Sequence, residues 1–190
     1  MKPNHRFVCK AAVLAVSTCL MSFFCLPPAY AGSAAEIDRK VASGLETLYA
    51  GSPTAKELST VAKAILVFPD IIKAGLVIGG QYGEGALLEK GQTFGYYNTV
   101  AASYGLQVGA QSFGYAMFLM TDDALQYLKK SEGWEIGVGP TVVVVDAGVA
   151  RSLTTSTAKE DIYAFFFDQK GLMAGLGLQG SKITRINPDK

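Results

Sequence analysis

In several stretches of the chain, glycines fall on one face of an alternating pattern, and this alternation is the strongest restriction on the fold. In residues 74–86, Gly75, Gly79, Gly83 and Gly85 share one face of an extended strand, opposite large apolar side chains. The same scheme recurs in residues 104–111, 134–139 and 172–180. Glycine inside a strand costs stability, so a repeated glycine face implies close approach of backbone or helix, or strong bending. We expect an antiparallel, strongly bent, glycine-rich sheet or a small β-barrel.

Two N-terminal segments and one internal segment have helical patterns. Residues 33–50 place apolar side chains on one helical face, and Pro53 opens a second helical stretch expected over residues 54–68. Thr121 is a suitable N-cap for a short helix over residues 121–130, which has acids in its first turn and lysines in its last. The sequence therefore predicts an α+β fold, with two N-terminal helices and one short internal helix packed on the sheet.

Two further strands are expected in the C-terminal half. Residues 140–146 contain four consecutive valines and predict a buried strand. Residues 162–168 predict a strand that turns through residues 169–171 into residues 172–180. Asp146 follows the valines, so it is the carboxylate that we most expect to be buried. It would be either an acid with a perturbed pKa or a strand-end residue that accepts backbone hydrogen bonds.

The first 31 residues have the pattern of a secretory signal peptide. A basic start precedes an apolar run of about 16 residues, shorter than the roughly 20 that a helix needs to span a bilayer. The small-x-small sequence at residues 29–31 predicts cleavage after Ala31. We expect export to the periplasm or cell envelope and a single mature domain over residues 32–190. The alternatives are a retained membrane anchor and a lipoprotein modified at Cys19 or Cys25.

The leader holds all the cysteine and histidine of the chain, namely Cys9, Cys19, Cys25 and His5. A processed chain therefore lacks thiolate and imidazole, on which most zinc and transition-metal sites and the Ser-His-Asp and Cys-His nucleophile systems depend. We expect a non-enzymatic domain with no metal, no cofactor and no disulfide. Any acid–base chemistry would have to use Asp, Glu, Lys or Tyr side chains.

Charge excludes one class of partner. Loss of Lys2, Arg6 and Lys10 with the leader changes the formal net charge from +1 to −2. Nucleic-acid binding needs a concentrated basic surface, so we expect no nucleic-acid partner.

Several short segments together carry a family resemblance. They are residues 62–69 (AKAILVFP), 73–79 (KAGLVIG), 83–88 (GEGALL), 105–111 (GLQVGAQ), the expected helix at 121–128, Gly139-Pro140 and residues 170–180 (KGLMAGLGLQG). In this order, over roughly residues 36–186, they resemble the SYLF-domain family of eukaryotic membrane-associated and bacterial secreted proteins. Secreted relatives look like a small β-barrel packed around helices.

The resemblance also implies a function. In eukaryotic members the domain binds phosphoinositides and other anionic lipids, and some members bind or bundle actin. For an exported chain it implies a non-catalytic, membrane-associated envelope protein that binds anionic lipids, with phosphatidylglycerol or cardiolipin as the sensible ligands. Actin binding is not carried over, because an exported protein would not meet actin.

Contact with anionic lipid would need a local basic patch, because the expected mature chain is not basic overall. The candidate lipid-binding residues are Lys56, Lys63, Lys73, Lys129 and Lys130. Two other functions stay open. One is a structural or interaction protein that binds an envelope protein partner without lipid affinity, and the other is an enzyme that uses two facing carboxylates.

Overall fold

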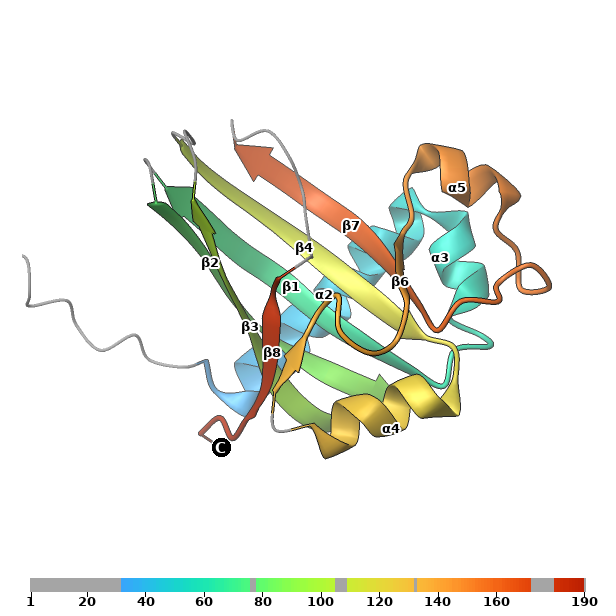
Figure 1. The fold of residues 1–190 in the computed structure, drawn as a ribbon, viewed down its shortest axis with the longest axis horizontal. Coiled ribbons are helices and arrows are strands. Elements are labelled where there is room, and N and C mark those ends of the chain that lie inside the picture. The colour runs from blue at the N-terminus through green and yellow to red at the C-terminus, as the bar shows by residue number, and fades with distance from the viewer. Residues whose placement is uncertain (1–31, 76–77, 105–108, 132, 172–179, 190) are drawn as a thin grey trace, which may run out of the picture. The chain divides into compact units, whose positions relative to one another are not determined.

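The computed structural model describes residues 32–75, 78–104, 109–131, 133–171 and 180–189 (Figure 1). All of them belong to the compact unit formed by residues 32–190. Within these residues, no helix has the length and hydropathy that crossing a bilayer would require.

Eight strands form one curled sheet. They are β1 (Ala64–Gly75), β2 (Ile78–Glu89), β3 (Gln92–Tyr104), β4 (Gly109–Leu119), β5 (Trp134–Glu135), β6 (Val142–Val144), β7 (Ile162–Gly171) and β8 (Lys182–Ile186). Their order is β5-β8-β3-β2-β1-β4-β7-β6, and only the β6–β7 pair is parallel. Figure 1 shows the sheet bent into a half-barrel, so the α+β prediction is confirmed in its bent-sheet form. Among the described strands β5 and β6 remain as edges, and the barrel is not closed.

Side-chain caps set where the helices begin. The helices are α2 (Ala34–Gly51), α3 (Pro53–Leu58), α4 (Asp122–Lys130) and α5 (Ala147–Ser152). Ser33, Ser52 and Thr121 each accept a hydrogen bond from the backbone N–H three residues later, which satisfies a donor that the first helical turn leaves open. The helices predicted over residues 33–50 and 121–130 are confirmed.

The sheet is buried on both faces along much of β1. Leu66 and Phe68 belong to a core cluster that includes residues of α4, and Val67 belongs to a second cluster that includes residues of α2 and α3. Successive strand residues point to opposite faces, so an unbroken apolar run fits a strand covered on both sides.

The helix predicted over residues 54–68 is wrong beyond its first turns. α3 ends at Leu58, and β1 begins at Ala64. β1 pairs with β2 on one side and β4 on the other, so two ladders satisfy its backbone groups. Pro69 does not end the strand, because both ladders shift register next to it at a β-bulge. Periodicity alone does not separate a short buried helix from a buried central strand, and here the sheet pairing decides.

Two stretches predicted as single strands are divided between neighbouring strands. β1 ends at Gly75 and β2 begins at Ile78, both inside the predicted strand 74–86. The predicted strand 104–111 likewise begins with the last residue of β3 and ends within β4. Glycine alternation continues from one antiparallel strand into the next, so the pattern did not mark the chain reversals. Of the predicted strand 172–180, residues 172–179 lie outside the described part of the chain.

The C-terminal strands differ from the prediction in extent. Only Trp134–Glu135 of residues 134–139 is a strand, and β6 takes up three residues of the 140–146 stretch. β6 is an edge strand with partly exposed side chains, so the prediction of a buried strand is wrong. The strand predicted over residues 162–168 is confirmed. The hairpin predicted at residues 169–171 is wrong, because β7 continues to pair with β4 through them.

Glycines surround the bulge of β1 and permit its close contacts. A Cβ atom at Gly85 would overlap a backbone carbonyl of β1, and one at Gly114 would overlap the ring of Phe167. Gly44 of α2 lies so close that a Cβ there would stand 3.2 Å from the Cβ of Pro69. The interpretation of the glycine face as a site of close approach is confirmed for residues 74–86, where a Cβ at Gly83 or Gly85 would overlap β1.

Gly85→Ala should therefore destabilise the domain, because the added methyl would push β2 away from β1. The expected loss in the free energy of unfolding is about 1–3 kcal/mol, measured by urea denaturation. Gly51→Ala is the matched control, since nothing lies within 4 Å of a Cβ there. Equal effects of the two substitutions would contradict the close-approach account.

Candidate functional site

An apolar cleft lies between α2 and the adjoining ends of β1 and β2. Its volume is about 510 Å³, within the roughly 300–1,000 Å³ typical of small-molecule sites. Its apolar lining consists of Val41, Ala42, Leu45, Tyr49, Ala62, Ala64, Ile65 and Leu88. Several of these side chains are only half-buried, so they leave apolar surface open to the cleft.

Helix and strand geometry together produce this lining. Val41, Leu45 and Tyr49 are spaced four residues apart, so they form a stripe along one side of α2. Ile65 and Leu88 are direct cross-strand partners, so their side chains lie side by side on the same face of the sheet. The cleft therefore has one helical wall and a floor of paired strand residues.

Two lysines lie at one end of this cleft. Lys63 and Lys90 both line the cleft, and each lies two residues beyond the Ile65–Leu88 pair. Lys90 and Gly91 have φ angles of 49° and 77° in the tight turn between β2 and β3. Positive φ at both central residues is typical of a type I′ hairpin turn. The hairpin thus places a cation where the apolar floor ends.

Hydrogen bonds to Asp38 fasten α2 over the cleft. The Asp38 carboxylate accepts one from the Tyr96 hydroxyl at 2.9 Å and one from the Thr93 hydroxyl at 2.8 Å. Both donors belong to β3, so these bonds tie the helix to the sheet beside the cleft. Burial and the Asp38 carboxylate raise the pKa of Tyr96, which keeps its phenol protonated as a donor.

Two of the predicted lipid-binding lysines form ion pairs. Lys63 Nζ lies 3.2 Å from Asp122 Oδ2, and Lys129 Nζ lies 2.6 Å from Glu89 Oε1. Lys129 also lies over the ring of Phe94, 4.1 Å from its centroid. Lys129 therefore joins the end of α4 to the β2–β3 hairpin, which is a structural role.

The other three predicted lysines are dispersed. Lys56 is exposed on α3, and Lys130 is exposed at the end of α4. Lys73 is half-buried near the far end of β1, about 30 Å from Lys63 along an extended strand. The structure does not gather the five lysines into one patch. It brings Lys63 together with Lys90, which our sequence analysis missed, although a Lys-Gly pair between two strands is a hairpin signal.

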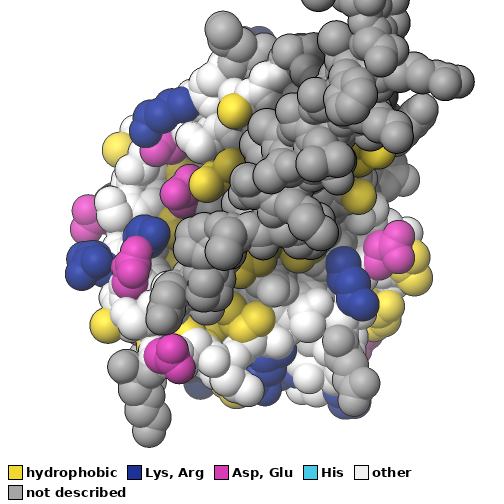
Figure 2. Space-filling view, turned by 90° about the vertical axis from the view of Figure 1, so that its left-hand side faces the viewer, with side chains coloured by type: hydrophobic (Ala, Val, Ile, Leu, Met, Phe, Trp, Pro, Cys, Tyr) yellow, Lys and Arg dark blue, Asp and Glu magenta, His cyan; other side chains and the backbone are white. Residues whose placement is uncertain are grey.

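Two other surfaces contrast with the cleft. Figure 2 shows Lys and Arg side chains interspersed with Asp and Glu on the face it presents, so its described residues form no single-sign field. Elsewhere, Ile72, Tyr82 and Val100 are cross-strand neighbours on β1, β2 and β3, with 60%, 46% and 46% of their surface exposed. We call these three residues the Ile72 row.

A second cavity, of about 360 Å³, lies between α2 and the bulged part of the sheet. Its lining includes Asp70 and Asp168 together with Lys40 and Lys170. Lys170 Nζ lies 3.0 Å from both carboxylate oxygens of Asp168. Asp168 is thus part of an ion pair, and nothing in this cavity specifically favours the enzyme hypothesis. Among the described residues, including those of this cavity, no group of three His, Cys, Asp or Glu side chains could hold a metal ion.

The prediction that Asp146 is buried is wrong. It is the exposed N-cap of α5, where its Oδ1 accepts the N–H groups of Gly148 at 2.8 Å and Val149 at 2.9 Å. These bonds, the one from Val149 foremost, lower the pKa of the carboxyl group. The alternative, that it accepts backbone hydrogen bonds, is confirmed.

Comparison with known families gives the coarse class of the domain. Residues 100–188 match the family model described as "Ysc84: Las17-binding protein actin regulator". This match over the C-terminal half supports membership of the SYLF-domain family. It bears out the resemblance drawn from the sequence, and the matched family is one of binding domains. No curated protein matches the chain. The match begins in β3, so most of the cleft, on α2, β1 and β2, precedes it.

Tyr96→Phe should loosen α2, because it removes a hydrogen bond to the Asp38 carboxylate. We expect the free energy of unfolding to fall by about 1–2 kcal/mol in urea denaturation. Tyr127→Phe, on the exposed side of α4, should change it by less than about 0.5 kcal/mol. Asp38→Asn should cost less in the Tyr96→Phe background than in the wild type, and simple additivity would argue against the bond.

Proposed function

We propose that this SYLF domain is a non-catalytic protein of the cell envelope that binds anionic phospholipid. One acyl chain would lie in the cleft beneath α2, with the headgroup phosphate at Lys63 and Lys90. The observation that carries the proposal is an apolar floor that ends at two lysines.

The apolar lining supports the acyl chain. Leu45, Tyr49, Ile65 and Leu88 are half-buried and line the cleft, so an acyl chain would remove their remaining apolar surface, and its own, from water. Each buried methylene of a lipid contributes about 0.8 kcal/mol. This hydrophobic part of the binding free energy does not depend on the charge of the lipid headgroup.

The two lysines support an anionic headgroup. A basic residue near a charged lipid surface contributes on the order of 1 kcal/mol, and salt weakens the attraction. The charge of Lys63 is partly neutralised by Asp122, whose Oδ2 lies 3.2 Å from Lys63 Nζ, whereas Lys90 lies on an exposed turn. Lys90 should therefore give the larger part of the preference for anionic lipid.

The location in the cell envelope rests on the pattern of the first 31 residues. Phosphatidylglycerol and cardiolipin are the anionic phospholipids that an exported bacterial-style protein would meet. Either offers the phosphate and acyl chains that the cleft accommodates.

The first test is co-sedimentation of residues 32–190 with phosphatidylglycerol vesicles and with phosphatidylcholine vesicles. Binding should be stronger to phosphatidylglycerol and should weaken as salt rises from about 0.05 to 0.5 M, because screening shortens the reach of the lysines. Absence of binding at low salt would reject the lipid proposal. Capture of one defined envelope protein in that case would support the alternative, an interaction protein without lipid affinity.

Two pairs of substitutions test the position of the site. Ala42→Trp should fill the cleft and abolish vesicle binding, whereas Ala50→Trp, exposed on the same helix but outside the cleft lining, should not. Lys90→Asn removes a charge with a residue that tolerates positive φ, and it should weaken binding about fivefold, while Lys56→Asn leaves it unchanged. Binding that survives Ala42→Trp but is lost in Tyr82→Ser would move the contact to the Ile72 row and overturn the cleft.

A further inference from the structure

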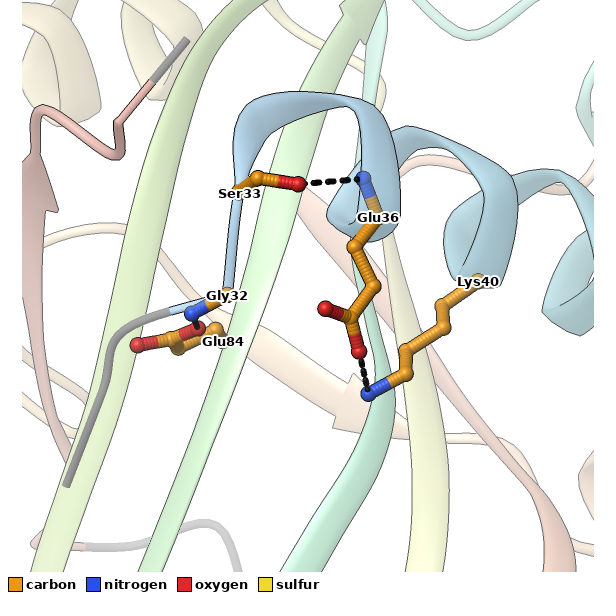
Figure 3. A network of polar contacts seen from close by, with 5 residues as sticks. All are labelled: Gly32, Ser33, Glu36, Lys40 and Glu84. Atoms are coloured by element: carbon orange, nitrogen blue, oxygen red, sulfur yellow. Dashed lines mark hydrogen bonds and ion pairs between the residues drawn. The ribbon is translucent and has the colours of Figure 1, made fainter.

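Residue Glu84, on β2, meets the first residue of the described chain. The backbone N–H of Gly32 donates to Glu84 Oε2 at 2.9 Å, as Figure 3 shows. The Tyr82 hydroxyl donates to the other oxygen, Oε1, at 2.6 Å. Glu84 is half-buried, so both oxygens of a partly desolvated carboxylate are held by neutral donors.

The neighbouring acid is already paired. Glu36, in the first turn of α2, forms an ion pair with Lys40 at 2.9 Å, as Figure 3 shows. Its carboxyl carbon also lies near Gly32, 3.9 Å from where a Cβ of Gly32 would stand. The start of α2 is also held from the C-terminal side, because Ala34 N–H donates to the carbonyl oxygen of Asp189 at 2.9 Å. The Gly32 nitrogen is thus fixed beside Glu84 by contacts on both sides of it.

We infer that Glu84 is the receptor for the α-ammonium group that signal-peptide removal creates at Gly32. The inference rests on cleavage after Ala31, which the leader sequence predicts. A signal peptidase hydrolyses the Ala31–Gly32 peptide bond with one water. The C–N bond breaks, the hydroxyl goes to the Ala31 carboxyl group, and the Gly32 nitrogen keeps the pair of electrons and takes up protons. The hydrogen bond from the neutral Gly32 N–H to the Glu84 carboxylate then becomes an ion pair.

Helix electrostatics explain why such a receptor is needed. The N-terminus of a helix carries a partial positive charge, so a new ammonium group beside it is unfavourable. Gly32 immediately precedes Ser33, the N-cap of α2. Glu84, contributed by the sheet, offsets that repulsion and holds the helix against β2. Processing would therefore tighten α2 on the sheet.

The ion pair should depend on pH in a defined direction. An α-amino group ordinarily has a pKa of about 7.7–8.0, and pairing with Glu84 raises it in the folded state. The stabilisation is then fully present below the ordinary pKa and is lost as pH rises through the raised one. The described ionisable groups around Gly32 are Glu84 and Tyr82 of β2, Glu36 and Lys40 of α2, and Asp189. Burial and the Glu84 carboxylate raise the pKa of Tyr82 to about 12, so its phenol stays a donor throughout.

The experiment compares the chain that begins at Gly32 with the same chain extended by Tyr30-Ala31. The extended chain keeps the Gly32 N–H and moves the ammonium group two residues away, to Tyr30. Residues 32–190 form a compact unit by themselves, so both chains contain the whole domain. At pH 7 the Gly32 chain should melt about 2–4 °C higher. The difference should vanish at pH 10.5, and also when both chains carry Glu84→Gln, which keeps an acceptor but removes the charge. Glu46→Gln, on an exposed part of α2, should preserve it.

Three results would overturn the inference. The first is equal melting temperatures of the two chains at pH 7, and the second is a difference that persists with Glu84→Gln. The third is a first residue other than Gly32 when the exported protein is sequenced from its N-terminus. Vesicle binding is not a readout here, so the lipid proposal and this inference fail independently.

Discussion

The bulge of β1 beside Pro69 is the constraint on which the rest of the domain depends. The ladders of β1 with β2 and with β4 both shift register there, and the β4–β7 ladder shifts nearby. A bulge bends a strand and increases its twist, so bulges aligned across adjacent strands curl the sheet. Glycines at positions 44, 85 and 114 leave room for the bent backbone and for α2 on top of it. The position of α2 on the sheet, and therefore the cleft beneath it, depends on this bend.

Local signals predicted a large part of the fold. The apolar stripe of residues 33–50 indicated α2, the Thr121 cap marked the start of α4, and glycine alternation indicated a bent antiparallel sheet. The prediction was wrong where the local sequence pattern suits one secondary structure and pairing with distant strands imposes another. Residues 64–68 have an apolar run that also suits a helix, and only pairing with β2 and β4 makes them a strand. The boundaries between β1 and β2 and between β3 and β4 were not predicted, because the glycine alternation of the sequence continues from one strand into the next.

The candidate site was harder to predict, for a physical reason. Which lysines lie together depends on register, and register is a property of two strands and not of one. Lys63 was a candidate from the sequence, but Lys90, which lines the same cleft, was not, because only the pairing of β1 with β2 brings their ends together. Lys129 looked like a surface cation, yet its contacts with Glu89 and Phe94 give it a place in the packing. Charge counted along a chain did not distinguish these roles.

The hydrogen bond from Ala34 to the carbonyl oxygen of Asp189 brings the two ends of the described domain to one corner. This hydrogen bond holds the N-terminal and C-terminal ends of the domain next to each other. A circular permutant, in which these ends are joined and the chain is opened at another exposed turn, should therefore keep the fold. For the same reason the domain can be inserted into an exposed turn of a host protein. The same closeness means that anything joined to either end is attached to the domain at that one corner.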